Sequence, residues 1–425
     1  MKGITKTLLL ALLALICSCG TTHRLKKDFS NNHKNSSFFK GFVLFNPETG
    51  KQIINHNGAK YFTPASNTKL YTFYAAYKIL GDSIKALEYF EKNDTLFVKG
   101  TADPTLLYDF ESTKTIDFLK NFEGNIALID EQIDDDRFGS GWSWGDYQYY
   151  YMPEKSLFPI YGNIVTYAMQ KDTISSVPTH FTTQIVVQDS IEINRQFNQN
   201  TFYLAINDTT LNYIPFKTST KLVAELLSDT LQKPVGVIPK GENQFTTTTY
   251  RSLYSVPADS VYKQLLVVSD NFIAEQLMLQ VGKEVTGNYN VHDAIDFVLE
   301  NHLASLPQEP RWVDGSGLSR YNLFTPENTV HLLTKMYNEI PLEKLLSYFP
   351  VGGVSGTLRN WYANDTPYVY AKSGTLSNNY SLSGYLITKK GTVLIFSYMN
   401  NHYKLTNSQI RTQMQEHLFE IYNTY

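Results

Sequence analysis

The hydrophobic and polar positions near both ends of the chain predict strands that pair in hairpins. Residues 38–56, "FFKGFVLFNPETGKQIINH", are expected to form a strand, a turn at 47–50 and a return strand. Residues 380–399, "YSLSGYLITKKGTVLIFSYM", predict a second hairpin that turns at 389–391. The apolar runs of this second hairpin are nearly continuous, which indicates central strands covered on both faces.

Helical spacing follows the second hairpin. Apolar side chains recur there at every third or fourth position, at Ile410, Met414, Leu418 and Ile421, so a helix is predicted to close the chain. Strands at both ends with flanking helices predict an α/β (α+β) domain whose antiparallel sheet is built from both ends of the sequence.

The middle of the chain has a different pattern. Between about Leu87 and Asn243, short alternating runs such as "DTLFVKG", "TTQIVVQDS" and "NTFYLAIN" are separated by Asp, Asn and Thr. This pattern predicts a mainly β insertion, and helical pattern resumes at "TKLVAELLSDTLQK". We therefore divide the chain into a catalytic domain made of residues 38–87 and 244–425 and an inserted region of residues 88–243.

A helix that carries candidate catalytic residues is predicted at "TPASNTKLYTF", which begins at Thr63. It starts near Ser66, and its apolar face consists of Leu70, Phe73, Tyr77 and Leu80, with Gly81 at its end. A spacing of three places Ser66 and Lys69 on the same side of the helix. A serine hydroxyl needs a base to become a nucleophile, and a lysine is a base only when its pKa is lowered.

This motif is weak when taken alone. A serine at a helix start is most often a simple cap. The same spacing also occurs at Ser37 with Lys40 and at Ser260 with Lys263.

Composition and the absence of some common motifs narrow the class of protein. The 425 residues are 42% hydrophobic and 18% charged with a net charge of -3, which describes a globular protein and gives no electrostatic support for nucleic-acid binding. No HExxH pair and no P-loop is present, so neither a metal nor another cofactor is predicted.

The N-terminal segment has the features of an export signal. It has a basic start and an apolar run at 8–16 that is too short to span a bilayer. The letters "ICSC" resemble a bacterial lipobox, which predicts a lipoprotein signal peptide at 1–18, a lipid on Cys19 and a tether at 19–37. The alternative is an ordinary secretion signal. Either way both cysteines lie in this segment, which suits an exported protein without disulfides.

Two further motifs support the catalytic interpretation of Ser66. "LLVVSDNFIAEQLML" contains Ser269, Asp270 and Asn271 at the start of a predicted helix. "YVYAKSGTLSNNYSLSGYL" contains Lys372, Ser373, Gly374 and Thr375 at the end of a predicted strand. S-x-x-K, S-D-N and K-[ST]-G in this order are the active-site motifs of penicillin-binding proteins and serine β-lactamases.

Longer stretches resemble one family more specifically, the class C low-molecular-mass penicillin-binding proteins. These are D-alanyl-D-alanine carboxypeptidases and endopeptidases of the penicillin-binding protein 4 type. The similar stretches include "GTADPTL", "GSGWSWGDYQYYY", "DGSGLSRYNLFTP" and "VGGVSGTL". The resemblance implies a transpeptidase-like fold with an insertion after the first motif. Ser373 stands where the family usually has threonine.

The family and the chemistry together assign roles to the motif residues. Ser66 would attack a D-Ala-D-Ala peptide bond while Lys69 accepts its proton. The backbone N–H groups of Ser66 and Thr375 would stabilise the oxyanion. Ser269 and Lys372 would pass a proton to the leaving amine, and the positive charge of Lys372 would help to keep Lys69 neutral.

The remaining residues of the set would bind the substrate. Asn271 would bind the donor peptide and orient Lys69. The "KSGT" residues Lys372, Ser373, Gly374 and Thr375 would bind a terminal carboxylate.

The resemblance also implies a pocket for the residue that precedes D-Ala, usually meso-diaminopimelate. Asp146 would pair with its ammonium group, Arg320 would bind its carboxylate and Tyr151 would cover its methylenes. The alternative is that Asp146 and Arg320 are surface charges and that the aromatic residues belong to the core.

The predicted protein is a periplasmic, lipid-anchored serine peptidase. Its partners would be peptidoglycan peptides, β-lactam antibiotics and a membrane reached through the lipid. Two other functions remain open: a serine β-lactamase or esterase, and an inactive lipoprotein that only binds peptidoglycan.

Overall fold

The computed structural model describes residues 37–171, 173–240 and 249–425. The predicted signal peptide, Cys19 and all of the predicted tether except Ser37 lie outside these residues. None of the helices in the described part of the chain is both long and apolar enough to cross a membrane.

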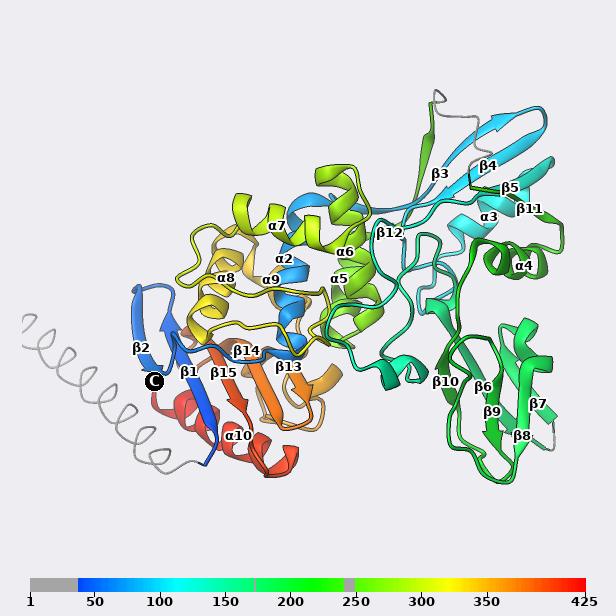
Figure 1. Cartoon of the computed structure of the whole chain (residues 1–425). Coiled ribbons are helices and arrows are strands. Elements are labelled where there is room, and N and C mark those ends of the chain that lie inside the picture. The colour runs from blue at the N-terminus through cyan, green and yellow to red at the C-terminus, as the bar shows by residue number, and fades with distance from the viewer. Residues whose placement is uncertain (1–36, 172, 241–248) are drawn as a thin grey trace, which may run out of the picture.

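One five-stranded antiparallel sheet joins the two ends of the described chain, as the sequence predicted (Figure 1). The hairpin at the N-terminal end supplies two of its strands, β1 and β2, and the hairpin at the C-terminal end supplies β14 and β15. β1 pairs with β15, with Phe39 opposite Asn401. In the order of the sheet, the strands are β13 (Val369–Leu376), β14 (Asn379–Ile387), β15 (Val393–Asn401), β1 (Phe39–Asn46) and β2 (Lys51–His56).

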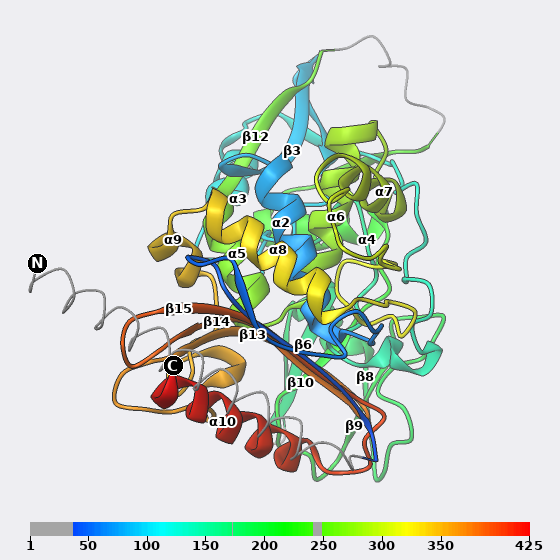
Figure 2. The ribbon, with the colours of Figure 1, turned by 90° about the vertical axis from the view of Figure 1, so that its left-hand side faces the viewer.

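Helices cover both faces of this sheet (Figure 2). One face carries a single helix, α10 (Asn407–Thr424), and its buried residues are Ile410, Met414, Leu418 and Ile421, as predicted. The other face carries the remaining helices of the domain. These are α2 (Lys69–Ile79), α5 (Ala258–Val267), α6 (Asn271–Thr286), α7 (Val291–Asn301), α8 (Pro326–Glu339) and α9 (Leu342–Ser347).

The helix that carries Lys69 differs from the prediction in two ways. It is preceded by a 3₁₀ turn, η1 (Ala65–Thr68), so Ser66 lies in the turn and Lys69 is the first residue of α2. Every residue from Lys69 to Ala76 is buried, because α2 packs between other helices and not on a surface. A single apolar face therefore describes only part of its surroundings.

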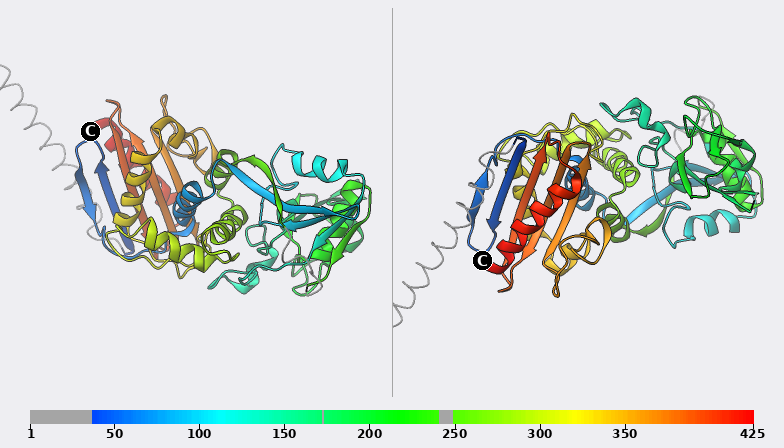
Figure 3. Two further views of the ribbon diagram at one scale, coloured as in Figure 1. Left: turned by 90° about the horizontal axis from the view of Figure 1, so that it is seen from above. Right: turned by 90° about the horizontal axis from the view of Figure 1, so that it is seen from below.

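The inserted region forms three separate sheets among its described residues, on one side of the catalytic domain (Figure 3). A mixed five-stranded sheet has the order β11 (Val235–Ile238), β5 (Asn125–Ile129), β4 (Thr95–Gly100), β3 (Ser83–Lys92) and β12 (Arg251–Pro257). A three-stranded sheet contains β10 (Asn212–Pro215), β6 (Ile164–Gln170) and β7 (Thr173–Val177), and a two-stranded sheet contains β8 (Ile185–Gln188) and β9 (Phe202–Ala205). The described residues of this region also form two α-helices, α3 (Lys114–Asn121) and α4 (Thr220–Leu231).

The strand pairing indicates where the chain leaves the catalytic domain and returns to it. The backbone N–H of Ala258 donates to the carbonyl of Asp82 at 2.9 Å, so the outgoing and returning segments lie side by side. The sequence-based boundary between residues 87 and 88 falls inside β3, and β12 pairs with β3. We therefore propose residues 83–257 as the inserted unit.

Candidate active site

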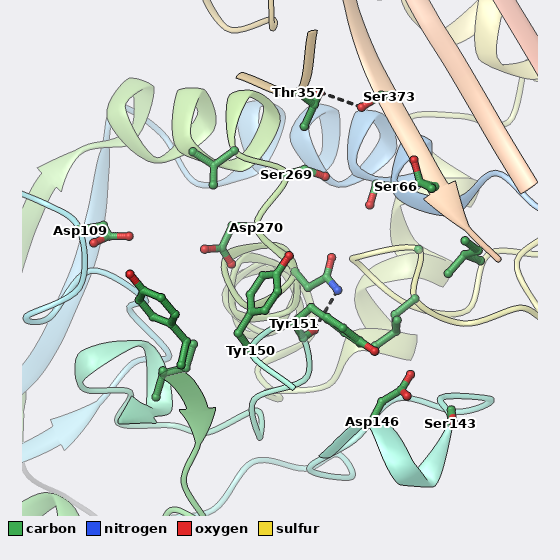
Figure 4. A pocket seen from close by; sticks show the side chains of 18 of the residues that line it. Ser66, Asp109, Ser143, Asp146, Tyr150, Tyr151, Ser269, Asp270, Thr357 and Ser373 are labelled. Carbon is green, nitrogen blue, oxygen red and sulfur yellow. Dashed lines mark hydrogen bonds between the residues drawn. The ribbon is translucent and has the colours of Figure 1, made fainter. Parts of the chain in front are cut away.

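The three motifs meet at one cleft between the catalytic sheet and the inserted region (Figure 4). Ser66 comes from η1, Ser269 from the loop between α5 and α6, and Ser373 from the edge strand β13. All three line the cleft, which has a volume of about 1410 Å³. The fold thus brings Ser66 together with segments that follow it by about 200 and about 300 residues in the sequence.

Two residues beside the reacting groups have left-handed backbone conformations. Ala65, which precedes Ser66, has a φ of 51°, and Ser269 has a φ of 70°. Residues other than glycine adopt positive φ values at a cost of roughly 1–2 kcal/mol. The packing around both segments must therefore hold Ala65 and Ser269 in this conformation. Gly317 has no side chain and packs directly against the carbonyl of Ala65, where a Cβ would collide.

Lys69 lies completely buried beneath Ser66. Its Nζ lies 3.0 Å from Ser66 Oγ, 2.6 Å from Asn271 Oδ1 and 2.6 Å from the backbone carbonyl of Ser316. A neutral amine has two N–H groups and one lone pair. The two short contacts are to oxygens that only accept, so they take both N–H groups and leave the lone pair for the hydroxyl of Ser66. The geometry is that of a base poised to remove the serine proton.

The surroundings of Lys69 also favour the neutral form of its amine. Burial lowers the pKa of Lys69 to about 8, although three nearby carboxylates oppose the shift. We expected the charge of Lys372 to be the cause, but burial of Lys69 is the largest one. The repulsion between the two ammonium groups acts on Lys372, whose pKa is lowered well below its usual value by burial and then by Lys69.

Ser269 and Lys372 form a second hydrogen-bonded pair at the cleft. Lys372 Nζ donates to Ser269 Oγ at 2.7 Å and to the carbonyl of Ser373 at 2.7 Å. The hydroxyl of Ser269 therefore accepts from Lys372 and keeps its own proton for another acceptor. This arrangement can deliver a proton to an amine that leaves from the cleft.

The loop that carries Ser269 is held by its neighbour Asp270. One carboxylate oxygen of Asp270 caps α6 by accepting from the N–H of Ile273 at 3.0 Å, and the other accepts from the hydroxyl of Tyr108 at 2.6 Å. Burial raises the pKa of Asp270, and these hydrogen bonds oppose that shift. Asp270 and Tyr108 are positioning residues that the motif comparison did not assign.

The strand β13 approaches the turn η1 very closely. A Cβ at Gly374 would lie 2.9 Å from the backbone nitrogen of Ser66, and Asn67 Nδ2 donates to the carbonyl of Lys372 at 2.8 Å. The exposed Thr375 follows directly. The segments that carry the two expected oxyanion donors, the N–H groups of Ser66 and Thr375, thus lie beside each other.

Thr357 is a residue that the sequence did not single out. Its Oγ1 accepts from the hydroxyl of Ser373 at 2.7 Å, and it lines the cleft from the 3₁₀ turn η5 (Gly356–Leu358). "VGGVSGTL" contains it, so the resemblance covered the position without assigning its contact.

The loop "DGSGLSRYN" provides the backbone carbonyl of Ser316 to which Lys69 donates, and buried carboxylates hold this loop in place. The carboxylate of Asp314 accepts from the N–H of Gly317 at 2.8 Å and from the N–H of Ser319 at 2.7 Å. Glu275 accepts from the N–H of Ser316 at 2.7 Å, and its pKa is raised by burial and by Asp314. These bonds fix the carbonyl of Ser316, to which Lys69 donates.

The three residues predicted for substrate binding line the same cleft as Ser66. The side chains of Asp146 and Tyr151 lie near each other (Figure 4), and burial, followed by the charge of Asp146, raises the pKa of Tyr151 to about 12. The backbone carbonyl of Tyr151 accepts from Asn271 Nδ2 at 2.8 Å, so this stretch contacts a catalytic motif directly. Arg320 is exposed, and its Nη2 lies 3.5 Å from the carbonyl of Ser377.

Neither the cleft nor the rest of the described chain offers a group of three or more His, Cys, Asp and Glu side chains arranged to hold a metal ion. The chemistry of the site is described by its hydroxyl, amine and amide groups.

Comparison with known proteins identifies the family. Residues 31–420 match the sequence model of the D-Ala-D-Ala carboxypeptidase 3 (S13) family. The chain belongs to this family. The resemblance of the longer sequence stretches predicted a family of D-Ala-D-Ala carboxypeptidases, and the match confirms that prediction.

Individual relatives agree with the family match. The D-alanyl-D-alanine carboxypeptidase DacB of Haemophilus influenzae is 23% identical over 88% of this chain and 87% of its own length. A penicillin-sensitive carboxypeptidase A of Dictyostelium discoideum is 23% identical over 86% of this chain and 83% of its own length.

Solved structures show the same fold. Penicillin binding protein 4 from Haemophilus influenzae superposes with a TM-score of 0.75 at 19% identity, over 93% of this chain and 99% of its own. A predatory peptidoglycan endopeptidase from Bdellovibrio bacteriovorus gives a TM-score of 0.53 at 16% identity, over 91% and 93%. These matches confirm the penicillin-binding, transpeptidase-like fold with an inserted domain.

Proposed function

We propose that this carboxypeptidase cleaves peptidoglycan stem peptides or cross-links through an acyl-enzyme formed on Ser66. The observation that carries the proposal is the position of Lys69, whose Nζ lies 3.0 Å from Ser66 Oγ and whose pKa is lowered to about 8. A base at this distance with this pKa is partly neutral near physiological pH and can take the proton of the attacking hydroxyl.

The reaction begins with attack of Ser66 Oγ on the carbonyl that precedes the terminal D-Ala. The proton moves to Lys69, and the carbonyl oxygen becomes an oxyanion. The backbone N–H groups of Ser66 and Thr375 stabilise this oxyanion, supported by the closeness of β13 and η1.

Collapse of the tetrahedral intermediate breaks the peptide bond and needs a proton for the leaving amine. Ser269 donates its proton to that amine and regains one from Lys372, which lies 2.7 Å away. The acyl group then remains on Ser66 until a water molecule hydrolyses the ester. The hydroxide of the water forms the released acid, its proton returns to Ser66 Oγ, and the proton that Lys69 took replaces the one that Lys372 gave, so both lysines regain their starting states.

Asn271 connects the base to the substrate. Its Oδ1 accepts from Lys69, and its Nδ2 carries two hydrogens, of which one is taken by the carbonyl of Tyr151. The second hydrogen is available for a carbonyl of the donor peptide. Asn271 therefore orients the base and the acyl chain together.

The same protein is proposed to work in the periplasm, attached to a bacterial membrane by a lipid on Cys19. This part rests on the N-terminal sequence, because Cys19 lies outside the described residues.

Two measurements test the function. The purified protein should form a long-lived covalent adduct with a fluorescent penicillin, and peptide mapping should place the adduct on Ser66. The protein should also release D-Ala or cleave cross-links in purified muropeptides, as measured by mass spectrometry, and Ser66→Ala should abolish both activities.

The outcomes separate the alternatives. Rapid turnover of the fluorescent penicillin would indicate a β-lactamase, and absence of any adduct and of any muropeptide cleavage would indicate an inactive binding protein. Ser260→Ala is the matched control, because Ser260 has the same spacing to a lysine but lies in α5, and this variant should keep both activities.

A further inference from the structure

Arg411 is a cation of the cleft that none of the three motifs contains. It lies in the first half of α10, the helix on the back face of the catalytic sheet, yet it lines the same cleft as Ser66, Ser373 and Thr375. Only one other residue in the lining of this cleft is a lysine or arginine, namely Arg320.

Two aromatic rings hold the guanidinium group of Arg411. Its Cζ lies 4.9 Å from the ring centre of Tyr380 and 5.6 Å from that of Trp361. Tyr380 stands directly opposite Thr375 in the pairing of β13 with β14. Trp361 follows the turn η5, in which Thr357 accepts from Ser373. The guanidinium therefore lies beside the strand segment that carries the "KSGT" residues.

Arg411 has no carboxylate counter-ion within the described part of the chain, although the hydroxyl of Tyr380 lies within hydrogen-bond reach of its guanidinium group. No carboxylate there lies within 4.0 Å of it, and its buried Nε has no hydrogen-bond partner. An arginine keeps its charge at all physiological pH values, and a partly buried charge without a counter-ion is unfavourable. An arrangement of this kind favours an anion that arrives with a ligand.

The amino group of the neighbouring Lys372 already has two acceptors. Burial and Lys69 lower the pKa of Lys372 well below its usual value, and its Nζ donates to Ser269 and to a backbone carbonyl. Arg411 is thus a permanent positive charge beside β13, and the other arginine of the cleft, Arg320, lies near Ser377 just after that strand.

We propose that Arg411 binds the carboxylate group attached to the leaving amine, which in a stem peptide is the C-terminal carboxylate of D-Ala. This assignment rests on the proposed function. A cross-link presents a carboxylate in the same position, on the carbon that carries the leaving amine, and penicillin carries one beside its β-lactam nitrogen. Arg411 contacts this group together with the hydroxyls of Ser373 and Thr375, so it determines that the enzyme cuts bonds next to a free carboxylate.

The test compares two acylating agents that differ only at this carboxylate, benzylpenicillin and its methyl ester. Arg411→Gln should lower the second-order rate of Ser66 acylation by benzylpenicillin about tenfold to a hundredfold, the effect of losing one charge-assisted hydrogen bond. Acylation by the methyl ester should change less than about twofold, because the ester offers no charge to Arg411. Arg411→Lys should recover part of the rate with benzylpenicillin.

Arg359→Gln is the matched control, because Arg359 is exposed and follows η5 but does not line the cleft. It should leave both rates unchanged. Equal losses with both penicillins in Arg411→Gln would mean that the residue only packs between its two rings, and unchanged rates would also overturn the inference. A wild-type protein that neither penicillin acylates would instead refute the proposed function.

Discussion

Gly374 lies against the backbone nitrogen of Ser66, and a Cβ at position 374 would stand 2.9 Å from that nitrogen and 2.5 Å from the carbonyl of Pro64. A glycine is therefore required here by the close approach of a strand to a turn. We predict that Gly374→Ala pushes β13 away from η1 and lowers the rate of penicillin acylation at least about tenfold. Forcing a methyl group into such a contact costs roughly 1–3 kcal/mol, which thermal unfolding should detect as a loss of stability.

Gly236→Ala is the control for this prediction. Gly236 lies in β11 of the inserted region, where an added Cβ would meet only one atom, at an ordinary distance of 3.7 Å. This variant should keep its acylation rate. An acylation rate for Gly374→Ala equal to that of the wild type would contradict the close approach.

The pH dependence of acylation should follow the protonation of Lys69. Its pKa is lowered to about 8, and only the neutral amine can accept the proton of Ser66. The acylation rate should therefore rise about tenfold per pH unit below pH 8 and level off above it. Stopped-flow measurement of penicillin binding between pH 5.5 and 9.5, roughly the range in which Lys69 titrates, gives this profile. Lys69→Arg should abolish acylation, because a guanidinium cannot lose its proton in this range.

A pH profile that is flat, or that falls toward alkaline pH, would refute the role of Lys69 as base. Substantial labelling of Lys69→Arg would do the same.

Asn271 offers a way to move this profile. Its Oδ1 lies 2.6 Å from Lys69 Nζ, so Asn271→Asp would place a carboxylate against the amine. An opposite charge at this distance raises the pKa of a lysine by about 1–3 units. The midpoint of the acylation profile should move to higher pH by at least about one unit, and the rate at pH 7 should fall accordingly.

Asn423→Asp introduces the same charge on the exposed end of α10 and serves as the control. Its profile should match that of the wild type. A profile for Asn271→Asp that loses amplitude without moving would mean that Asn271 acts on the substrate alone.

The local parts of this site were predictable from the sequence because each motif consists of a few neighbouring residues. The spacing of Ser66 and Lys69 depends on one turn of helix or less. The buried face of α10 was predictable for the same reason. Such features need only the periodicity of a single element.

The remaining parts depend on contacts that no local pattern encodes. The second acceptor of Lys69 is the backbone carbonyl of Ser316, and a backbone oxygen leaves no trace in the identity of a residue. The partner of Ser373 is Thr357, and Arg411 reaches the cleft from the opposite face of the sheet. These positions are fixed by how β13, η5 and α10 pack together, which only the fold determines.

The predicted lipid anchor is tested by the N-terminal cysteines. Expressed in a bacterium, the protein should be extracted from the membrane fraction only by detergent and should incorporate a labelled fatty acid. Cys19→Ser should abolish the label and yield a soluble protein, because the thiol that carries the lipid is removed. Cys17→Ser is the control and should remain lipidated. A Cys19→Ser protein that still needs detergent would count against the anchor.

The last prediction concerns the substrate pocket, where substitutions should affect binding of a peptide without affecting acylation by penicillin. Asp146, Tyr151 and Arg320 line the cleft with Ser66, and the carbonyl of Tyr151 binds Asn271. The side chain of diaminopimelate ends in an ammonium and a carboxylate on one carbon. An acidic and a basic residue that face the same cleft can bind both groups, and the phenol ring can cover the methylenes between them.

We predict that Asp146→Asn and Arg320→Ala each lower kcat/KM for a peptide that contains diaminopimelate by about tenfold or more, through the loss of a charge-assisted hydrogen bond. Acylation by benzylpenicillin should remain within about twofold of the wild type, because penicillin has no group at that end of the cleft. Asp365→Asn and Arg359→Ala, both exposed and outside the cleft, are the charge-matched controls. Equal losses with peptide and penicillin would assign the two residues a role in folding. Unchanged kinetics with both would show that Asp146 and Arg320 are ordinary surface charges, since a residue that pairs with a charged group of the substrate must respond when that charge is left without a partner.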